Sequence, residues 1–243
     1  SIVSFCNRPG RQTVIAAGRR SRALMSQQFL KAVQDGKVDS VTRLLEQDPR
    51  LRDARTPEGV HAAVLALYHG HPDVAKAILA TKPLLDLHSA ATVGDFARVR
   101  ELVEPDAASV RSYSPDGFPP LGLAAYMGHA ALVEYLLGKG ADVNQVGTNR
   151  GRFTALTGAV SSGHREVVRR LLAAGADPNY WYQGGLTPVL EAAAGGSIPI
   201  LELLVAHGGD LTAETEQGKT AVSLALEHGH EAMAEWLRKH GAR

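Results

Sequence analysis

Glycine recurs in this chain at an almost constant interval, and this spacing constrains the fold more than any other feature. Each of these glycines precedes a short polar step and then an apolar stretch, and they are Gly36, Gly70, Gly94, Gly128, Gly163, Gly196 and Gly229. Five of the six intervals are 33 to 35 residues long, and the other is 24 residues. A period of this length predicts a repeat protein in which each unit packs on its neighbours.

The segments on both sides of each glycine have the apolar spacing of helices. A short stretch rich in Ala and Leu precedes it, as in 121–127, and a second apolar stretch follows, as in 167–172. We therefore expect each unit to be a short helix, a turn with positive φ at glycine, and a longer antiparallel helix. One pair of helices cannot bury its own apolar face, so the units must stack.

The composition is that of an ordinary globular protein: 44% of the 243 residues are hydrophobic, although only 5% are aromatic. The net charge is +1, but residues 1–24 contain five arginines and no acid. Removing those five from the 26 Lys and Arg leaves 21 basic against 25 acidic residues. Because affinity for nucleic acid depends largely on cationic contacts, we expect no nucleic-acid partner.

Two further features concern the cellular location. Cys6 is the single cysteine, so no intramolecular disulfide can form, which suits a reducing compartment. No apolar run reaches the length needed to span a bilayer. We expect a cytoplasmic monomer with no membrane span.

Several short motifs in the repeats are those of a known family. They are Gly-Leu-Thr-Pro-Val at 185–189, Gly-His at 128–129, 163–164 and 229–230, Gly-Ala-Asp-Val-Asn at 140–144, and Gly-Ala-Asp-Pro-Asn at 175–179. The chain resembles the ankyrin repeat family over residues 26–243, with about seven repeats, of which the first three are degenerate. The resemblance implies an all-α solenoid of helix pairs joined by short β-hairpin fingers.

Two regions depart from the family pattern. The 24-residue interval leaves no room for a finger between the second and third repeats, so we expect a gap in the row of fingers there. Residues 1–25 match no repeat and form an Arg-rich N-terminal tail. This tail could be a transit peptide, or it could be disordered or loosely docked sequence upstream of a true start at Met25.

Nothing in the sequence predicts catalysis or a cofactor. The pairs His69/His71 and His228/His230 resemble metal ligands, but Gly-His belongs to the ankyrin pattern and no cysteine lies in the repeats. The glycine-rich pieces lack the Lys-Ser/Thr signature of a phosphate-binding loop. We therefore expect a protein that is not an enzyme and binds no cofactor or metal. The alternative is an enzyme, or a small-molecule or metal-binding protein, of unknown type.

The resemblance implies that a partner would contact the finger tips and the inner face of each first helix. Although aromatic residues are scarce in the chain, they are concentrated at these positions in repeats four to six, and aromatic and Arg side chains dominate interface hot spots. The candidate partner-binding residues are Phe118, Tyr126, Met127, Arg150, Arg152, Phe153, Tyr180, Trp181 and Tyr182. We expect a protein-interaction module or scaffold whose partner the sequence does not identify.

Overall fold

The computed structural model describes residues 23–242, which divide into two compact units, 23–85 and 86–242. The expectations for the Arg-rich tail and Cys6 fall on residues 1–22, outside the described part. The first helix covers 23–34, so it begins inside the segment assigned to the tail. The division between the units falls at the 24-residue interval.

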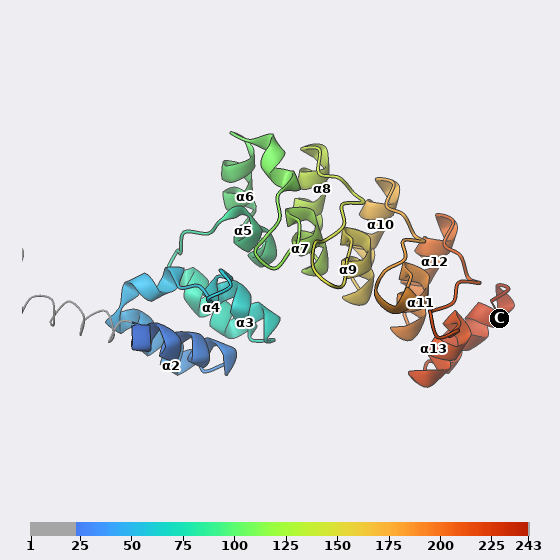
Figure 1. Ribbon diagram of the computed structural model, residues 1–243, viewed down its shortest axis with the longest axis horizontal. Coiled ribbons are helices and arrows are strands. Elements are labelled where there is room, and N and C mark those ends of the chain that lie inside the picture. Colours follow the sequence, from blue (N-terminus) through green and yellow to red (C-terminus); the bar gives the residue numbers. More distant parts are fainter. Residues whose placement is uncertain (1–22, 243) are drawn as a thin grey trace, which may run out of the picture. The chain divides into compact units, whose positions relative to one another are not determined.

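Unit 1 contains two helix pairs (Figure 1). The helix over 23–34 pairs with α2 (Val38–Gln47), a 3-10 helix η2 (Pro49–Asp53) follows, and α3 (Ala62–Tyr68) then pairs with α4 (Pro72–Ala80). The segment from 81 to 86 joins α4 to the next helix and forms no finger, as the short interval predicts.

Unit 2 contains five helix pairs that stack in chain order (Figure 1). The first helices are α5 (Leu87–Val93), α7 (Pro120–Tyr126), α9 (Ala155–Ser161), α11 (Pro188–Ala194) and α13 (Ala221–Glu227). The second helices are α6 (Phe96–Val103), α8 (Ala130–Gly138), α10 (Arg165–Ala173), α12 (Ile198–Ala206) and α14 (Glu231–Lys239). With the two pairs of unit 1, the described residues contain the seven helix pairs that the glycine period predicts.

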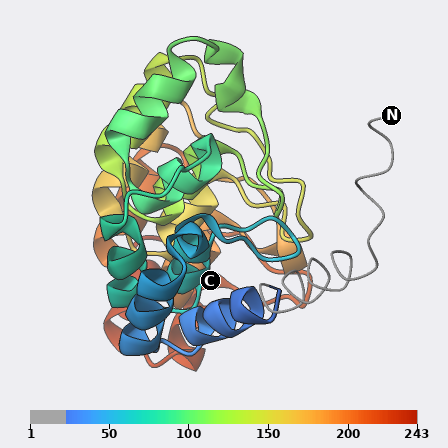
Figure 2. The same cartoon turned by 90° about the vertical axis from the view of Figure 1, so that its left-hand side faces the viewer.

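The fingers of unit 2 are tight turns rather than β-hairpins. Figure 2 shows these loops on one side of the helices. Within residues 23–242 the only strand-like pairings are isolated bridges at Arg55–His61, Tyr182–Leu186 and Glu214–Thr220. The turns close too soon for a ladder: the Gly218 N–H donates to the Thr215 carbonyl oxygen at 2.9 Å, and the Thr215 N–H donates to the Lys219 carbonyl oxygen at 2.9 Å. The prediction of β-hairpin fingers is therefore not confirmed.

Several of the first helices begin where the sequence supplies a side-chain cap. Thr154, Thr187 and Thr220 each precede a first helix and accept a hydrogen bond from the backbone N–H three residues later, which satisfies one of the free amides of the helix start. The second helices contribute most of the large, fully buried side chains, among them Leu136, Leu171, Ile200 and Leu204. Most alanines of the first helices are almost fully buried and let neighbouring helices approach closely.

All seven repeat glycines have positive φ, between 69° and 81°. Several also make room for a histidine of the next repeat. A Cβ atom on Gly128 would lie 2.7 Å from the His164 ring, and His164 Nε2 lies 3.0 Å from the Tyr126 carbonyl oxygen. His71 stands in the same way against Gly36, and His129 against Gly94. In these repeats the histidine of the Gly-His motif therefore fixes the turn of the preceding repeat.

The Gly-Ala-Asp-x-Asn motif links successive loops on the other side of the repeats. Asn144 donates through Nδ2 to the Gly175 carbonyl oxygen at 3.1 Å and accepts at Oδ1 from the Asp177 N–H at 2.9 Å. Asn179 makes the same two bonds to Gly208 and Asp210. One amide side chain thus satisfies two backbone groups of the next repeat.

We expect Asn144→Ala to lower the free energy of unfolding by about 1–3 kcal/mol, because it leaves two backbone groups of the next loop without their partner. Urea unfolding followed by circular dichroism measures the change. Thr212→Ala is the matched control, because Thr212 has the same position in the last loop and its hydroxyl bonds only to Asp210 within that loop. Equal losses for the two variants would contradict a bridging role for Asn144.

Candidate functional site

Tyr126 lies at the end of α7 and keeps half of its side chain exposed, at 50%. It lies beside Gly158 of α9, where an added Cβ would come within 3.5 Å of the Tyr126 Cβ. A methyl group at that distance would make an ordinary van der Waals contact, so Tyr126 packs directly against the next first helix. Met127, which follows it, is half-buried. Both residues lie at the end of a first helix, where the sequence predicts a binding face.

Trp181 and Tyr182 take opposite sides of the sixth finger. Trp181 is 57% exposed, whereas Tyr182 is only 5% exposed. Tyr182 has an extended backbone, in which successive side chains point in opposite directions. The two residues therefore differ in what they can offer a partner.

The buried Tyr182 organises the finger from within. Its hydroxyl donates to Glu191 Oε2 at 3.1 Å, and its ring lies 5.5 Å from the Phe153 ring and 6.4 Å from the Tyr180 ring, centroid to centroid. Burial, together with the nearby Glu191 carboxylate, raises the pKa of Tyr182 well above its ordinary value. Tyr182 is thus a packing residue, which differs from the partner contact that the sequence suggests.

The other aromatic candidates are half-buried. Tyr180 donates its hydroxyl to the Arg152 carbonyl oxygen at 2.9 Å and so ties the sixth finger to the fifth. The Phe153 ring folds over Gly151, where a Cβ would lie only 2.1 Å from it. Phe118 has the same position in the fourth finger. Tyr180 and Phe153 therefore help to hold the fingers in place. All three side chains present part of their surface to solvent.

Arg150 and Arg152 are exposed on the fifth finger. Arg152 has a φ of 52°, in the left-handed region. Its N–H donates to Asn149 Oδ1 at 3.0 Å, so the backbone is fixed without help from the guanidinium. Four of the candidate residues, Tyr126, Arg150, Arg152 and Trp181, are therefore exposed, and Phe118, Met127, Phe153 and Tyr180 are half-buried.

Tyr113, which is 42% exposed, is absent from the residues predicted from the sequence. Gly117, Arg152, Gly185 and Gly218 share one position in successive fingers, because each donates its N–H to the carbonyl oxygen three residues earlier. Tyr113 and Trp181 both stand four residues before that position. An alignment of the fingers on this shared position therefore places Tyr113 at the position of Trp181.

The histidine pairs serve the fold. His71 Nε2 lies 3.0 Å from the Gln34 carbonyl oxygen, and His228 Nδ1 lies 2.9 Å from the Leu224 carbonyl oxygen. Among residues 23–242, no three His, Cys, Asp or Glu side chains are grouped so that they could hold a metal ion. One ring nitrogen of His71 and one of His228 therefore face backbone oxygens.

His88 and Ser112 form the one serine–histidine contact within residues 23–242 that could suggest chemistry. His88 Nε2 lies 3.3 Å from Ser112 Oγ, and burial lowers the pKa of His88. The Ser112 hydroxyl, however, donates to the Ser109 carbonyl oxygen at 2.6 Å, and Asp86 accepts from both the N–H and the hydroxyl of Ser89. The contact between His88 and Ser112 thus connects α5 with the next loop. These residues do not form the hydrogen-bonded chain of acid, histidine and serine that activates a nucleophile.

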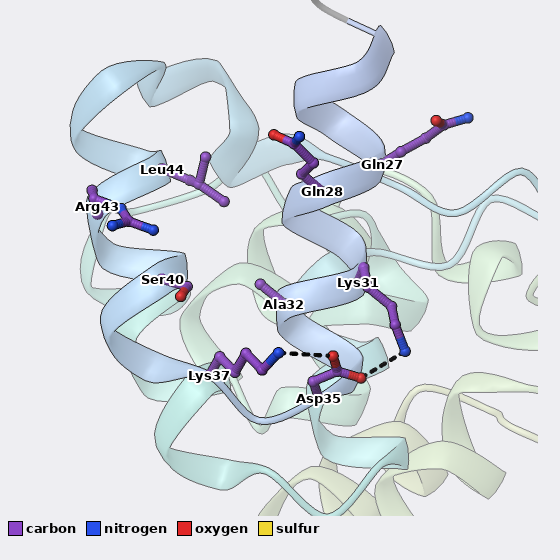
Figure 3. Close-up of a pocket in the computed structure, with 9 residues that line it drawn as sticks. All are labelled: Gln27, Gln28, Lys31, Ala32, Asp35, Lys37, Ser40, Arg43 and Leu44. Atoms are coloured by element: carbon purple, nitrogen blue, oxygen red, sulfur yellow. Dashed lines mark hydrogen bonds and ion pairs between the residues drawn. The ribbon is translucent and has the colours of Figure 1, made fainter.

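Unit 1 has a groove of about 560 Å³ between the helix over 23–34 and α2 (Figure 3). Lys31 and Lys37 both point to Asp35 across its lower end, at 2.7 Å and 3.3 Å from its carboxylate oxygens. Gln27, Gln28 and Arg43 add polar groups to its lining. The groove lies between the helices of the first repeat, and none of the candidate partner-binding residues lines it.

Comparison with known proteins establishes the family. The family model described as "Ankyrin repeats (3 copies)" matches residues 87–182 and 181–243, which together make up more than half of the chain. The chain therefore belongs to the ankyrin repeat family, whose members are generally protein-interaction modules. The match leaves out the first two repeats and begins with the third, which the sequence also marks as degenerate.

Three of the curated relatives are much longer proteins. A Caenorhabditis elegans homolog of transient receptor potential cation channel subfamily A member 1 is 36% identical over 149 residues, or 61% of this chain and 12% of the relative. Ankyrin repeat and KH domain-containing protein mask-1 of the same species is 42% identical over 95 residues, or 38% and 4%. Mouse ankyrin repeat and SAM domain-containing protein 6 is 37% identical over 102 residues, or 42% and 11%. The chain thus spans only a small part of each of these relatives.

None of the helices within residues 23–242 is long and apolar enough to cross a membrane.

Proposed function

We propose that this chain is a protein-binding module or scaffold that takes its partner on the exposed row of repeats four to six, defined here as Tyr113, Tyr126, Arg150, Arg152 and Trp181. The exposure of Trp181, at 57%, is the observation that carries the proposal. A tryptophan in water leaves a large apolar area unburied, and burying such a side chain in an interface contributes strongly to affinity. The neighbouring Tyr180 and Tyr182 already supply the packing of the finger, so Trp181 is left for another molecule.

The rigidity of the support favours the same surface. Tyr126 stands on α7, and its carbonyl oxygen lies within hydrogen-bonding distance of His164 in the next repeat. The fingers are joined through the bond from Tyr180 to Arg152 and through the bond from the Thr148 N–H to the Gly117 carbonyl oxygen, at 2.9 Å. A surface held in this way loses little conformational entropy when a partner binds.

We expect the double variant Trp181→Ala/Tyr126→Ala to lose the partners of the wild-type protein. Replacing each hot-spot residue should weaken the free energy of binding by about 2 kcal/mol or more. The measurement is affinity purification with quantitative mass spectrometry from the source cells. Phe96→Ala is the matched control: Phe96 is also an exposed aromatic residue of unit 2, but it lies on a second helix, against Tyr135. Circular dichroism verifies that every variant stays folded. If the folded double variant recovers the same proteins in the same amounts as the wild type, the proposed surface is wrong.

A further inference from the structure

Arg152 of the exposed row has a backbone conformation that glycine adopts at the same position of the other fingers in unit 2. The position shared by the fingers of unit 2 has positive φ in all four, at 84° for Gly117, 81° for Gly185 and 74° for Gly218, and at 52° for Arg152. A side chain in this region meets backbone strain that glycine avoids. Strained residues of this kind concentrate at functional sites.

Nothing within the described residues accounts for the arginine. The backbone of this finger is held by the Asn149 side chain and by the Tyr180 hydroxyl, which bond to the Arg152 N–H and carbonyl oxygen. Across residues 23–242 the guanidinium of Arg152 has no ion pair, and neither has that of Arg150. By contrast, Arg98, Arg169 and Arg170 on the second helices each pair with a glutamate.

The charges around these two arginines limit what they can bind. The adjoining sixth finger has no charged side chain, and the fourth carries Asp116. The seventh carries Glu214 and Glu216, and its Lys219 pairs with Glu227 of α13. Among the fingers of unit 2, positive charge without an ion pair is therefore confined to the fifth, which lies between the acidic fourth finger and the uncharged sixth. A nucleic acid running along the fingers would bring phosphates against these acids, whereas a short acidic stretch of protein matches a single cationic finger.

We propose that the fifth finger recognises an acidic segment of the partner protein, whose carboxylates pair with Arg150 and Arg152 while an adjacent apolar side chain lies against Trp181 or Tyr126. This inference rests on the proposed function and specifies its partner. Arginine suits the task because its planar guanidinium can pair with both oxygens of a carboxylate.

A phage library of random short peptides, selected on the purified protein, tests the inference. We expect the wild type to enrich peptides with Asp or Glu beside a large apolar residue, and Arg150→Glu/Arg152→Glu to lose that acidic preference. The best wild-type peptide should bind this variant about tenfold more weakly at low salt, with a smaller difference at high salt. Arg165→Glu/Arg238→Glu, which makes the same charge change on second helices, should bind it normally.

The outcomes separate this inference from the proposed function. Enriched peptides that need Trp181 but contain no excess of acid would overturn the acidic partner and keep the binding surface. Acidic peptides that still bind Arg150→Glu/Arg152→Glu would overturn the inference as well, and so would tighter binding of oligothymidylate than of any peptide. Acidic peptides that bind Trp181→Ala/Tyr126→Ala at full affinity would instead argue against the aromatic surface.

Arg152→Gly provides a readout that a purely structural role would not give. Because glycine accepts positive φ without strain, we expect this variant to melt at a higher temperature while it binds the selected peptide more weakly. A lower melting temperature would show that the Arg152 side chain supports the finger and would overturn its role in recognition.

Discussion

Gly128→Ala is expected to lower the free energy of unfolding by about 2–4 kcal/mol, from left-handed strain and overpacking together. Gly128 has a φ of 80°, where any Cβ is strained. The new methyl group would also lie 2.7 Å from the His164 ring. To relieve that contact the ring must move, which disturbs the hydrogen bond between His164 Nε2 and the Tyr126 carbonyl oxygen.

Gly163→Ala separates these two contributions. Gly163 has a φ of 74°, but nothing lies within 4 Å of the place that an added methyl group would take, because the next repeat has Ser197 where others have histidine. This variant should therefore lose only about 1–2 kcal/mol, the cost of the left-handed backbone. Urea unfolding of both variants gives the comparison. Equal losses would contradict the view that the histidine ring is held tightly against the glycine.

The repeat architecture could be predicted from the sequence because its determinants are local and recur. The glycine interval indicated the number of helix pairs, and the positive φ of each turn follows from glycine alone. The 24-residue interval predicted the missing finger between α4 and α5. The role of the Gly-His histidine could not be read in the same way, because the glycine that it contacts lies in the preceding repeat.

The orientation of the finger side chains could not be predicted as well. The run from Tyr180 to Tyr182 indicated exposed aromatic residues, but only the backbone shows that Trp181 points outward while Tyr182 packs inward against Phe153 and Glu191. Tyr113 was overlooked because its relation to Trp181 depends on the alignment of two fingers. The positive φ of Arg152 contradicts the preference of its residue type, so composition gives no sign of it.

The sixth and seventh fingers pack through close backbone contact. The Glu216 N–H of the seventh finger donates to the Gly184 carbonyl oxygen of the sixth at 3.2 Å. This contact requires a residue without a side chain at Gly185, where a Cβ would lie 2.5 Å from the Glu216 nitrogen. The glycine of the sixth finger therefore serves the approach of the seventh in addition to its own turn.

We expect Gly185→Ala to destabilise the seventh repeat by about 2–4 kcal/mol, because the obstructing atoms belong to backbone and the finger must shift. In a repeat array each unit depends on its neighbours. Relative to the wild type, amide hydrogen exchange should therefore become faster in α13 and α14, and change less in α7 and α8. Gly218→Ala is the matched control: its φ is 74° at the same finger position, with nothing within 4 Å of the added methyl group. This control should lose only about 1–2 kcal/mol from the left-handed backbone. If both variants speed exchange in α13 and α14 equally, the contact between the two fingers does not hold the last repeat in place.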